Sequence, residues 1–233
     1  MTTFDKALYN QYESLCLTRL SPNFILRDFM FSAEAAACEH SNFPSDDVEQ
    51  VIKSGKQLCT QVLEPVLEHF GRFALTFGYQ NRITIERNWT DQERAAKEHS
   101  SSPHQWDRGT FGKEVYARVD ILPFCVEDGQ ISKQDFAHWL MYNLDIDLLM
   151  QWRGSNVHCI TISPRPRRVW LEWVPSGEGT DGSNKIEFMG ENYWQQTFPT
   201  LPQGQQPHFY PSATNGSMRW KLDNQVQSKE TFL

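Results

Sequence analysis

Helical spacing of apolar residues dominates the first third of the chain. Over residues 1–20 the apolar side chains lie three or four positions apart, a spacing that predicts a short amphipathic helix. The longest such pattern covers residues 46–69, where an acidic start and one apolar stripe predict a helix that ends at Gly71. Pro65 has no backbone N–H to donate, so we expect it to kink or divide this helix.

Two shorter helices are predicted from serine caps. Ser32 stands before AEAAACEH, and Glu34 places a carboxylate in the first turn of that segment. Ser132 stands before KQDFAHWLMYN, whose apolar residues recur at helical spacing. Because a serine hydroxyl accepts from a free N–H of the first turn, both serines mark the starts of helices.

Strand-like patterns fill the middle of the chain. Short runs rich in β-branched and aromatic residues lie between turn residues, which is typical of strands. We expect extended segments at residues 73–80, 83–89, 115–124, 145–152, 156–163 and 167–174, the fourth and fifth joined through residues 153–155. Helices come first and strands later, so the order favours an α+β fold in which N-terminal helices pack on a small, mostly antiparallel sheet.

The composition of the chain changes near residue 176. From there to residue 233 it is rich in Pro, Gly, Gln and Ser and has few long apolar runs, although aromatic residues are spaced along it. Such a composition favours irregular structure. We therefore predict one domain at residues 1–175 and an irregular C-terminal extension at residues 176–233 that packs on the core through its aromatic side chains.

Charge and cysteine content narrow the classes of function. The net charge is −7 and the pI is about 5.5, which disfavours nucleic acid as the main partner. The five cysteines are widely spread without a C-x-x-C pair, so they form neither a disulfide framework nor a thiolate zinc knuckle. The chain shows no signal-peptide pattern and no run of about 18 apolar residues. We expect a cytoplasmic protein with no membrane partner; the oligomeric state is not indicated.

One stretch, residues 101–120, carries candidate metal chemistry. It contains His104 in a polar segment and Asp120 in the strand-like ARVDILPF, and His158 follows in the strand-like NVHCITIS. Two imidazoles and one carboxylate, with a fourth position left to water, are a common shell for catalytic zinc. His99 lies five residues before His104 and is a competing ligand, whereas His138, on a predicted helix, is expected to be structural.

The order of several segments resembles the D-alanyl-D-alanine carboxypeptidase-like zinc peptidases, of the Hedgehog/DD-peptidase fold, especially their compact branch in phages and bacteria. LSPNFILRDFMFSAEA is similar to the branch's opening L-S-x-x-F-x-L-x-E-F-x-x-S, KQLCTQVLEPVLEHFG to its helix, and LTFGYQN to its I-T-S-G-Y-R turn. The resemblance covers residues 20–173 approximately. It implies an α+β zinc peptidase that acts on peptide or peptidoglycan-fragment amides.

The family's metal signature, S-x-H-x-x-G-x-A-x-D followed by a later histidine, falls on the same three residues. The resemblance implies that His104, Asp120 and His158 hold Zn²⁺. His104 and Asp120 are sixteen residues apart here, against seven in the signature, so an insertion must loop out between them. Gln80 stands at the place of the family's substrate-binding arginine, and Arg82 is the nearest substitute.

The remaining roles have several candidates. The family places an acidic general base shortly before the last histidine, but residues 148–157 contain no carboxylate. Asp147 is our candidate for this base, with Asp107 and Glu114 as rivals. In the basic run at residues 164–168, Arg165 and Arg167 are candidates for binding a substrate carboxylate or phosphate, although solvated arginines on a hairpin are the simpler interpretation.

Three hypotheses about function follow. The first is a zinc-dependent metallopeptidase-like hydrolase that acts on peptidoglycan-type amides. The second is a binding or interaction module that keeps the fold without catalysis, suggested by Gln80 and by the missing acid before His158. The third is a hydrolase of another anionic ligand, for which the arginine run is the only motivation.

Overall fold

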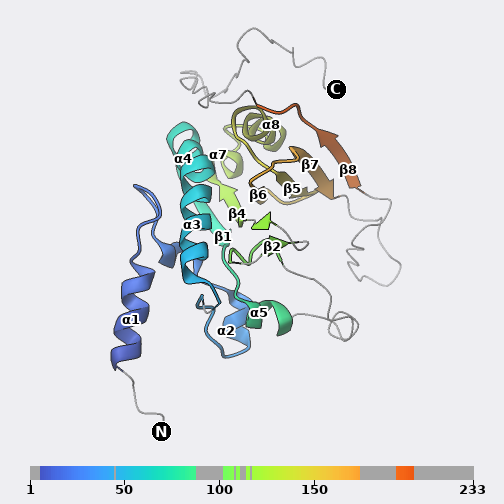
Figure 1. Cartoon of the computed structure of the whole chain (residues 1–233). Helices are drawn as coiled ribbons and strands as arrows, with labels where there is room; N and C mark the ends of the chain where they lie inside the picture. Colours follow the sequence, from blue (N-terminus) through green and yellow to red (C-terminus); the bar gives the residue numbers. More distant parts are fainter. Residues whose placement is uncertain are drawn as a thin grey trace, which may run out of the picture. The chain divides into compact units, whose positions relative to one another are not determined.

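The computed structural model describes residues 6–44, 46–87, 102–107, 109–110, 114–115, 117–173 and 193–201 (Figure 1). Its helices are α1 (Lys6–Cys16), the 3-10 helix η1 (Leu26–Phe29), α2 (Ala33–Ala37), α3 (Val48–Leu58), the π-helix η2 (Cys59–Leu63), α4 (Glu64–Phe70), α5 (Arg82–Arg87), α7 (Phe124–Glu127) and α8 (Lys133–Asn143). Its strands are β1 (Phe73–Phe77), β2 (Gly109–Thr110), β3 (Glu114–Val115), β4 (Ala117–Pro123), β5 (Leu148–Trp152), β6 (His158–Ile162), β7 (Val169–Trp173) and β8 (Tyr193–Thr197).

The strands form a six-stranded sheet in the order β1-β4-β6-β5-β7-β8 and a separate two-stranded sheet, β2-β3. The six-stranded sheet is mixed, because β7 runs parallel to β5 and antiparallel to β8. Together with the helices it confirms the predicted α+β class. The predicted pairing of the segments now seen as β5 and β6 is also confirmed, since the two strands are neighbours in the sheet.

The predicted helix at residues 46–69 is present, and Pro65 divides it as expected. Its carboxylate cap is Asp47, whose Oδ1 accepts from the Gln50 N–H at 2.9 Å. Because Pro65 cannot donate, the regular ladder fails one turn before it, and the Glu64 N–H bonds back to the Cys59 carbonyl, five residues away. The result is α3 and α4 joined through the π-helix η2. Gly71, with a φ of +79°, ends α4 as predicted.

Local capping explains both the helices that were predicted and one that was not. Ser32 Oγ accepts from the Ala35 N–H at 3.2 Å, and Ser132 Oγ accepts from the Asp135 N–H at 3.0 Å, which confirms both serine caps. The extended segment predicted at residues 83–89 is wrong for its described part, which is helix α5. Asn81 Oδ1 accepts from both the N–H and the hydroxyl of Thr84, and this cap outweighs the β-branched composition.

The chain divides into two compact units. The first comprises Met1–Glu64, Leu75–Asp120 and Thr161–Pro164, and the second comprises Pro65–Ala74, Ile121–Ile160 and Arg165–Leu233. The predicted boundary at residue 175 lies outside the described residues, so it stays a prediction. Of the predicted C-terminal extension, the structure describes residues 193–201, where β8 joins the sheet beside β7.

Trp106 is the centre of packing in the first unit. Its ring is fully buried and contacts the ring of Phe29, with the centroids 5.2 Å apart. Helix α3 passes close by at Gly55, where a Cβ atom would lie 3.1 Å from the Trp106 ring. The indole N–H of Trp106 donates to the Arg118 carbonyl on β4 at 3.1 Å. The loop that carries Trp106 is thereby anchored to β4.

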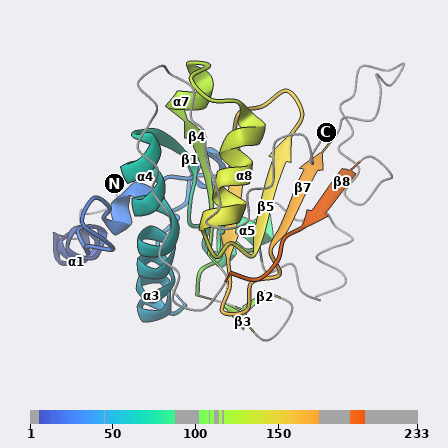
Figure 2. The same cartoon turned by 90° about the horizontal axis from the view of Figure 1, so that it is seen from above.

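Helix α8 packs against the strands of the second unit (Figure 2). Phe136 contacts the ring of His158 on β6, and His138 contacts Trp170 on β7, so the prediction that His138 is a packing residue agrees with its position. Buried Arg168 donates to the carbonyls of Met141 and Leu144 at the end of α8, and the Leu144 carbonyl also accepts from the Ile146 N–H at 3.0 Å. Within the described part of the chain, no helix is long and apolar enough to cross a membrane.

Candidate metal centre

His104 is held in one orientation by the backbone that follows β1. Its Nδ1 lies 2.7 Å from the Gly78 carbonyl oxygen, and its own carbonyl accepts from the Gln80 N–H at 2.9 Å. The edge of the Phe77 ring packs against the imidazole. A carbonyl can only accept, so Nδ1 carries the proton in the neutral ring and Nε2 carries the lone pair. This is the arrangement in which a metal-binding histidine is usually supported.

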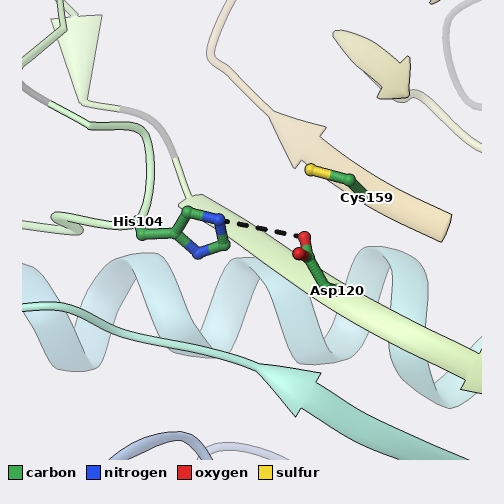
Figure 3. Close-up of side chains that lie close together, drawn as sticks. All are labelled: His104, Asp120 and Cys159. Atoms are coloured by element: carbon green, nitrogen blue, oxygen red, sulfur yellow. Dashed lines mark ion pairs between the residues drawn. The ribbon is translucent and has the colours of Figure 1, made fainter. Parts of the chain in front are cut away.

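Asp120 lies opposite the free side of this imidazole. Its Oδ1 is 3.8 Å from His104 Nε2, and both side chains are mostly buried, with exposed fractions of 17% and 10% (Figure 3). On β4 buried and half-buried residues alternate, which places Asp120 on the half-buried face. The Asp120 carbonyl accepts from Thr76 Oγ1 of β1 at 3.2 Å. The position of Asp120 is therefore fixed by the sheet.

Burial keeps His104 neutral. The pKa of His104 is lowered to about 3, mainly because the charged ring would lose its hydration, and secondly because Arg118 is positive. Backbone hydrogen bonds with Gly78 and Arg118 act in the opposite direction and do not outweigh burial. At neutral pH the lone pair of Nε2 therefore faces a carboxylate oxygen. Two acceptors that face each other are stabilised by a cation between them.

Cys159 completes a group of three candidate ligands. The donor atoms of His104, Asp120 and Cys159 all lie within 4.8 Å of one another, and Cys159 is almost fully buried on β6 (Figure 3). In a tetrahedral zinc site, ligand atoms about 2.0–2.3 Å from the metal are about 3.3–3.7 Å from one another. The His104–Asp120 distance of 3.8 Å is already close to that range. The His104–Asp120 pair would reach this range after a shift of well under 1 Å, whereas the Cys159 sulfur, within 4.8 Å of both, would have to move closer by up to about 1 Å.

The structure does not bring His158 into this group. His158 and Cys159 are consecutive residues of β6, so their side chains point to opposite faces of the sheet. The His158 ring contacts Phe136, and its Nδ1 lies 2.9 Å from the Asn156 carbonyl oxygen. Burial lowers the pKa of His158 to about 3, and the backbone bonds with Asn156 and Lys133 oppose this effect. Cys159 was not predicted as a ligand from the sequence. The one feature that could have pointed to it is that it directly follows His158, the predicted ligand, on the same strand.

Asp147, the predicted general base, and Arg167, a predicted substrate ligand, bind each other. Arg167 Nε and Nη2 donate to the two carboxylate oxygens at 3.0 and 2.5 Å, and the Arg167 N–H donates to Oδ1 at 2.9 Å. The Asp147 side chain has no exposed surface, whereas more than half of the Arg167 side chain is exposed. Use of either residue in catalysis would require this ion pair to open.

The other candidates lie in varied surroundings. Arg82 is half-exposed and forms an ion pair with Glu86, one turn further along α5, at 3.3 Å. Arg165 is exposed. The rival base Asp107 accepts from the Tyr79 hydroxyl at 3.3 Å, and burial raises the pKa of Asp107. The rivals His99 and the side chain of Glu114 lie outside the described residues.

The insertion between His104 and Asp120 contains the two-stranded sheet. Gly109 pairs with Val115 and Thr110 pairs with Glu114, antiparallel. The residues of the insertion thus turn back on themselves, so the long spacing is compatible with a short distance between the two ligands.

These features define an α+β protein with a candidate His/Asp/Cys metal-binding group. Comparison of the chain with protein-family models, with curated proteins and with solved structures gave no match.

Proposed function

We propose that the protein binds zinc through His104, Asp120 and Cys159 and acts as a zinc-dependent hydrolase of peptide-type amides. The observation that carries the proposal is the orientation of His104, whose Nδ1 bonds to the Gly78 carbonyl while Nε2 faces Asp120 at 3.8 Å. A neutral imidazole held in this way needs no proton removed before it binds a metal ion.

The chemistry of the three side chains favours zinc over harder cations. Magnesium and calcium prefer shells of oxygen atoms, whereas nitrogen and thiolate donors suit zinc. Three protein ligands leave one position of a tetrahedral shell for water or substrate, which distinguishes catalytic from structural zinc sites. Cys159 binds a metal as the thiolate, so zinc binding should release a proton from it.

The residues around the group have defined tasks in this proposal. Zinc in such a site polarises a substrate carbonyl and activates water. The Gly78 carbonyl fixes the tautomer of His104, and the Phe77 ring limits the rotation of the imidazole. Asp120 supplies negative charge, which balances the cation. Arg82, which is half-exposed and paired with Glu86 at the surface, and the exposed Arg165 are candidates for orienting an anionic substrate end.

The substrate class comes from the ordered motifs at residues 20–173 that resemble D-alanyl-D-alanine carboxypeptidase-like peptidases. It is tested by incubating the zinc-loaded protein with a peptide that ends in D-alanyl-D-alanine and following D-alanine release by mass spectrometry. We expect release with the parent chain and at least a hundredfold less with Asp120→Asn. Asp128→Asn, an exposed loop position, is the matched control and should act like the parent.

Metal content is the more basic test. The purified protein should contain about one zinc per chain by elemental analysis, or take up one equivalent after treatment with a chelator. If the parent chain neither contains zinc nor binds it when it is supplied, the proposed zinc site is refuted, and the proposed hydrolase function with it.

A second candidate function is a metal-dependent binding module without catalysis. The ion pair between Asp147 and Arg167 favours it, because the predicted general base is occupied. This candidate predicts stoichiometric zinc with no peptide hydrolysis by the parent chain. Hydrolysis that is lost in Asp120→Asn while the fold is kept would exclude it.

A further inference from the structure

Arg118 lies beside the candidate metal ligands on the same face of β4. The strand alternates buried and half-buried residues, with Arg118, Asp120 and Leu122 on the half-buried side. Residues two apart on a strand are separated by about 6.6 Å along it and point the same way. The Cα atoms of Arg118 and Asp120 are therefore about 6.6 Å apart along β4, and the two side chains point to the same face.

One hydrogen bond orients the guanidinium of Arg118. Its Nε donates to Thr161 Oγ1 on β6 at 2.8 Å, and Thr161 is almost fully buried. Within the described residues this is the only hydrogen bond of the Arg118 side chain, and the group has no ion pair there. The bond uses the inner nitrogen and leaves both terminal nitrogens, Nη1 and Nη2, with donors to offer.

The positive charge of Arg118 acts at the candidate site. It is the second cause, after burial, of the lowered pKa of His104. The Arg118 carbonyl also accepts from Trp106 Nε1, so the backbone below the side chain is fixed. A fixed guanidinium whose terminal nitrogens have no hydrogen-bond partner among the described residues is suited to two parallel hydrogen bonds with a carboxylate or phosphate.

We propose that Arg118 binds the anionic group of the ligand that reaches the His104–Asp120–Cys159 group, and so selects ligands that carry a carboxylate or phosphate. This role deepens the proposed function and rests on it for the identity of the site. Of the arginines singled out from the sequence, Arg82 is paired with Glu86, Arg167 is paired with Asp147, and Arg165 is exposed.

The test is a titration of the full chain, zinc-loaded and metal-free, followed by ¹H–¹⁵N NMR. N-acetylglycine is the carboxylate probe and methyl phosphate the phosphate probe. We expect saturable binding of at least one probe, weakened at least tenfold in Arg118→Gln and less in Arg118→Lys, which keeps the charge but not the planar fork. Thr161→Val should weaken binding to an intermediate degree, because it frees the guanidinium to rotate. Arg72→Gln, at an exposed position, is the matched control.

The probe that binds shows whether Arg118 recognises a carboxylate or a phosphate on the ligand. Absence of saturable binding in both metal states, or binding by Arg118→Gln within twofold of the parent, overturns the proposal for Arg118. Zinc content is measured on the same samples. A chain that binds no zinc would refute the proposed function, and the titration of the metal-free protein would still test the role of Arg118. Equal thermal midpoints of parent and Arg118→Gln separate ligand binding from a structural role.

Discussion

Replacement of Asp120 by asparagine should change stability in opposite directions with and without zinc. In the metal-free protein the carboxylate Oδ1 faces the lone pair of His104 Nε2 at 3.8 Å. The amide of asparagine has nearly the same shape and brings an N–H that can donate to Nε2 after a shift of about 0.6–0.9 Å. A hydrogen bond of this kind contributes about 0.5–1.5 kcal/mol. We therefore expect the free energy of unfolding of the metal-free Asp120→Asn protein to exceed that of the parent by about 0.5–1.5 kcal/mol.

Zinc should reverse this order. A ligand that binds only the folded state at one hundred times its Kd stabilises that state by about 2.7 kcal/mol. Asp120→Asn removes the anionic ligand, so most of this gain should be lost and the variant should be less stable than the parent by about 2 kcal/mol.

Urea denaturation, in chelator and in buffered excess zinc, measures both differences on the same preparations. Asp128→Asn is the control and should track the parent in both buffers. An equal loss of stability in the two buffers would mean that Asp120 is structural, and the reasoning from the facing lone pairs would be refuted.

Three further predictions concern the same region and its neighbours. Cys159→Ala should weaken zinc binding at least tenfold by competition with a chromogenic chelator, whereas His158→Ala should change it less than threefold; the reverse order would make His158 the ligand. Without metal, stability should fall as the pH drops from about 6.5 toward 3, because His104 and His158 have lowered pKa values near 3 and only the unfolded chain takes up these protons. Each contributes about 1.4 kcal/mol per pH unit, and a flat urea midpoint between pH 6.5 and 5 would contradict this. Asp147→Asn should cost about 1–3 kcal/mol in urea denaturation because it weakens the bonds to Arg167; unchanged stability would count against a structural role.

Features that depend on a few neighbouring residues could be predicted from the sequence. Ser32 and Ser132 start helices because the hydroxyl and the N–H it accepts from are three residues apart. Pro65 disturbs its helix through its own missing donor. The error at α5 was also local, because β-branched composition was weighed above the cap that Asn81 provides.

The parts of the candidate site that the sequence could not give depend on how strands pair. A histidine and a cysteine are adjacent on β6, and only the strand's orientation decides which one faces Asp120. Likewise, β7 pairs in parallel with β5, with Leu148 opposite Val169, and this places Asp147 beside Arg167. Local patterns do not reveal a crossover between these strands.

The bond from Trp106 to the Arg118 carbonyl has a consequence for how this chain can vary. It closes the loop between the candidate ligands at its base, while Gly78 and Gln80 hold His104 from the other side. Neither anchor involves residues 108–116. The entropy of closing a loop changes only slowly with its length, so residues could be added or removed there at small thermodynamic cost. The sixteen-residue spacing between His104 and Asp120 is then a place where new sequence can be inserted without moving the ligands.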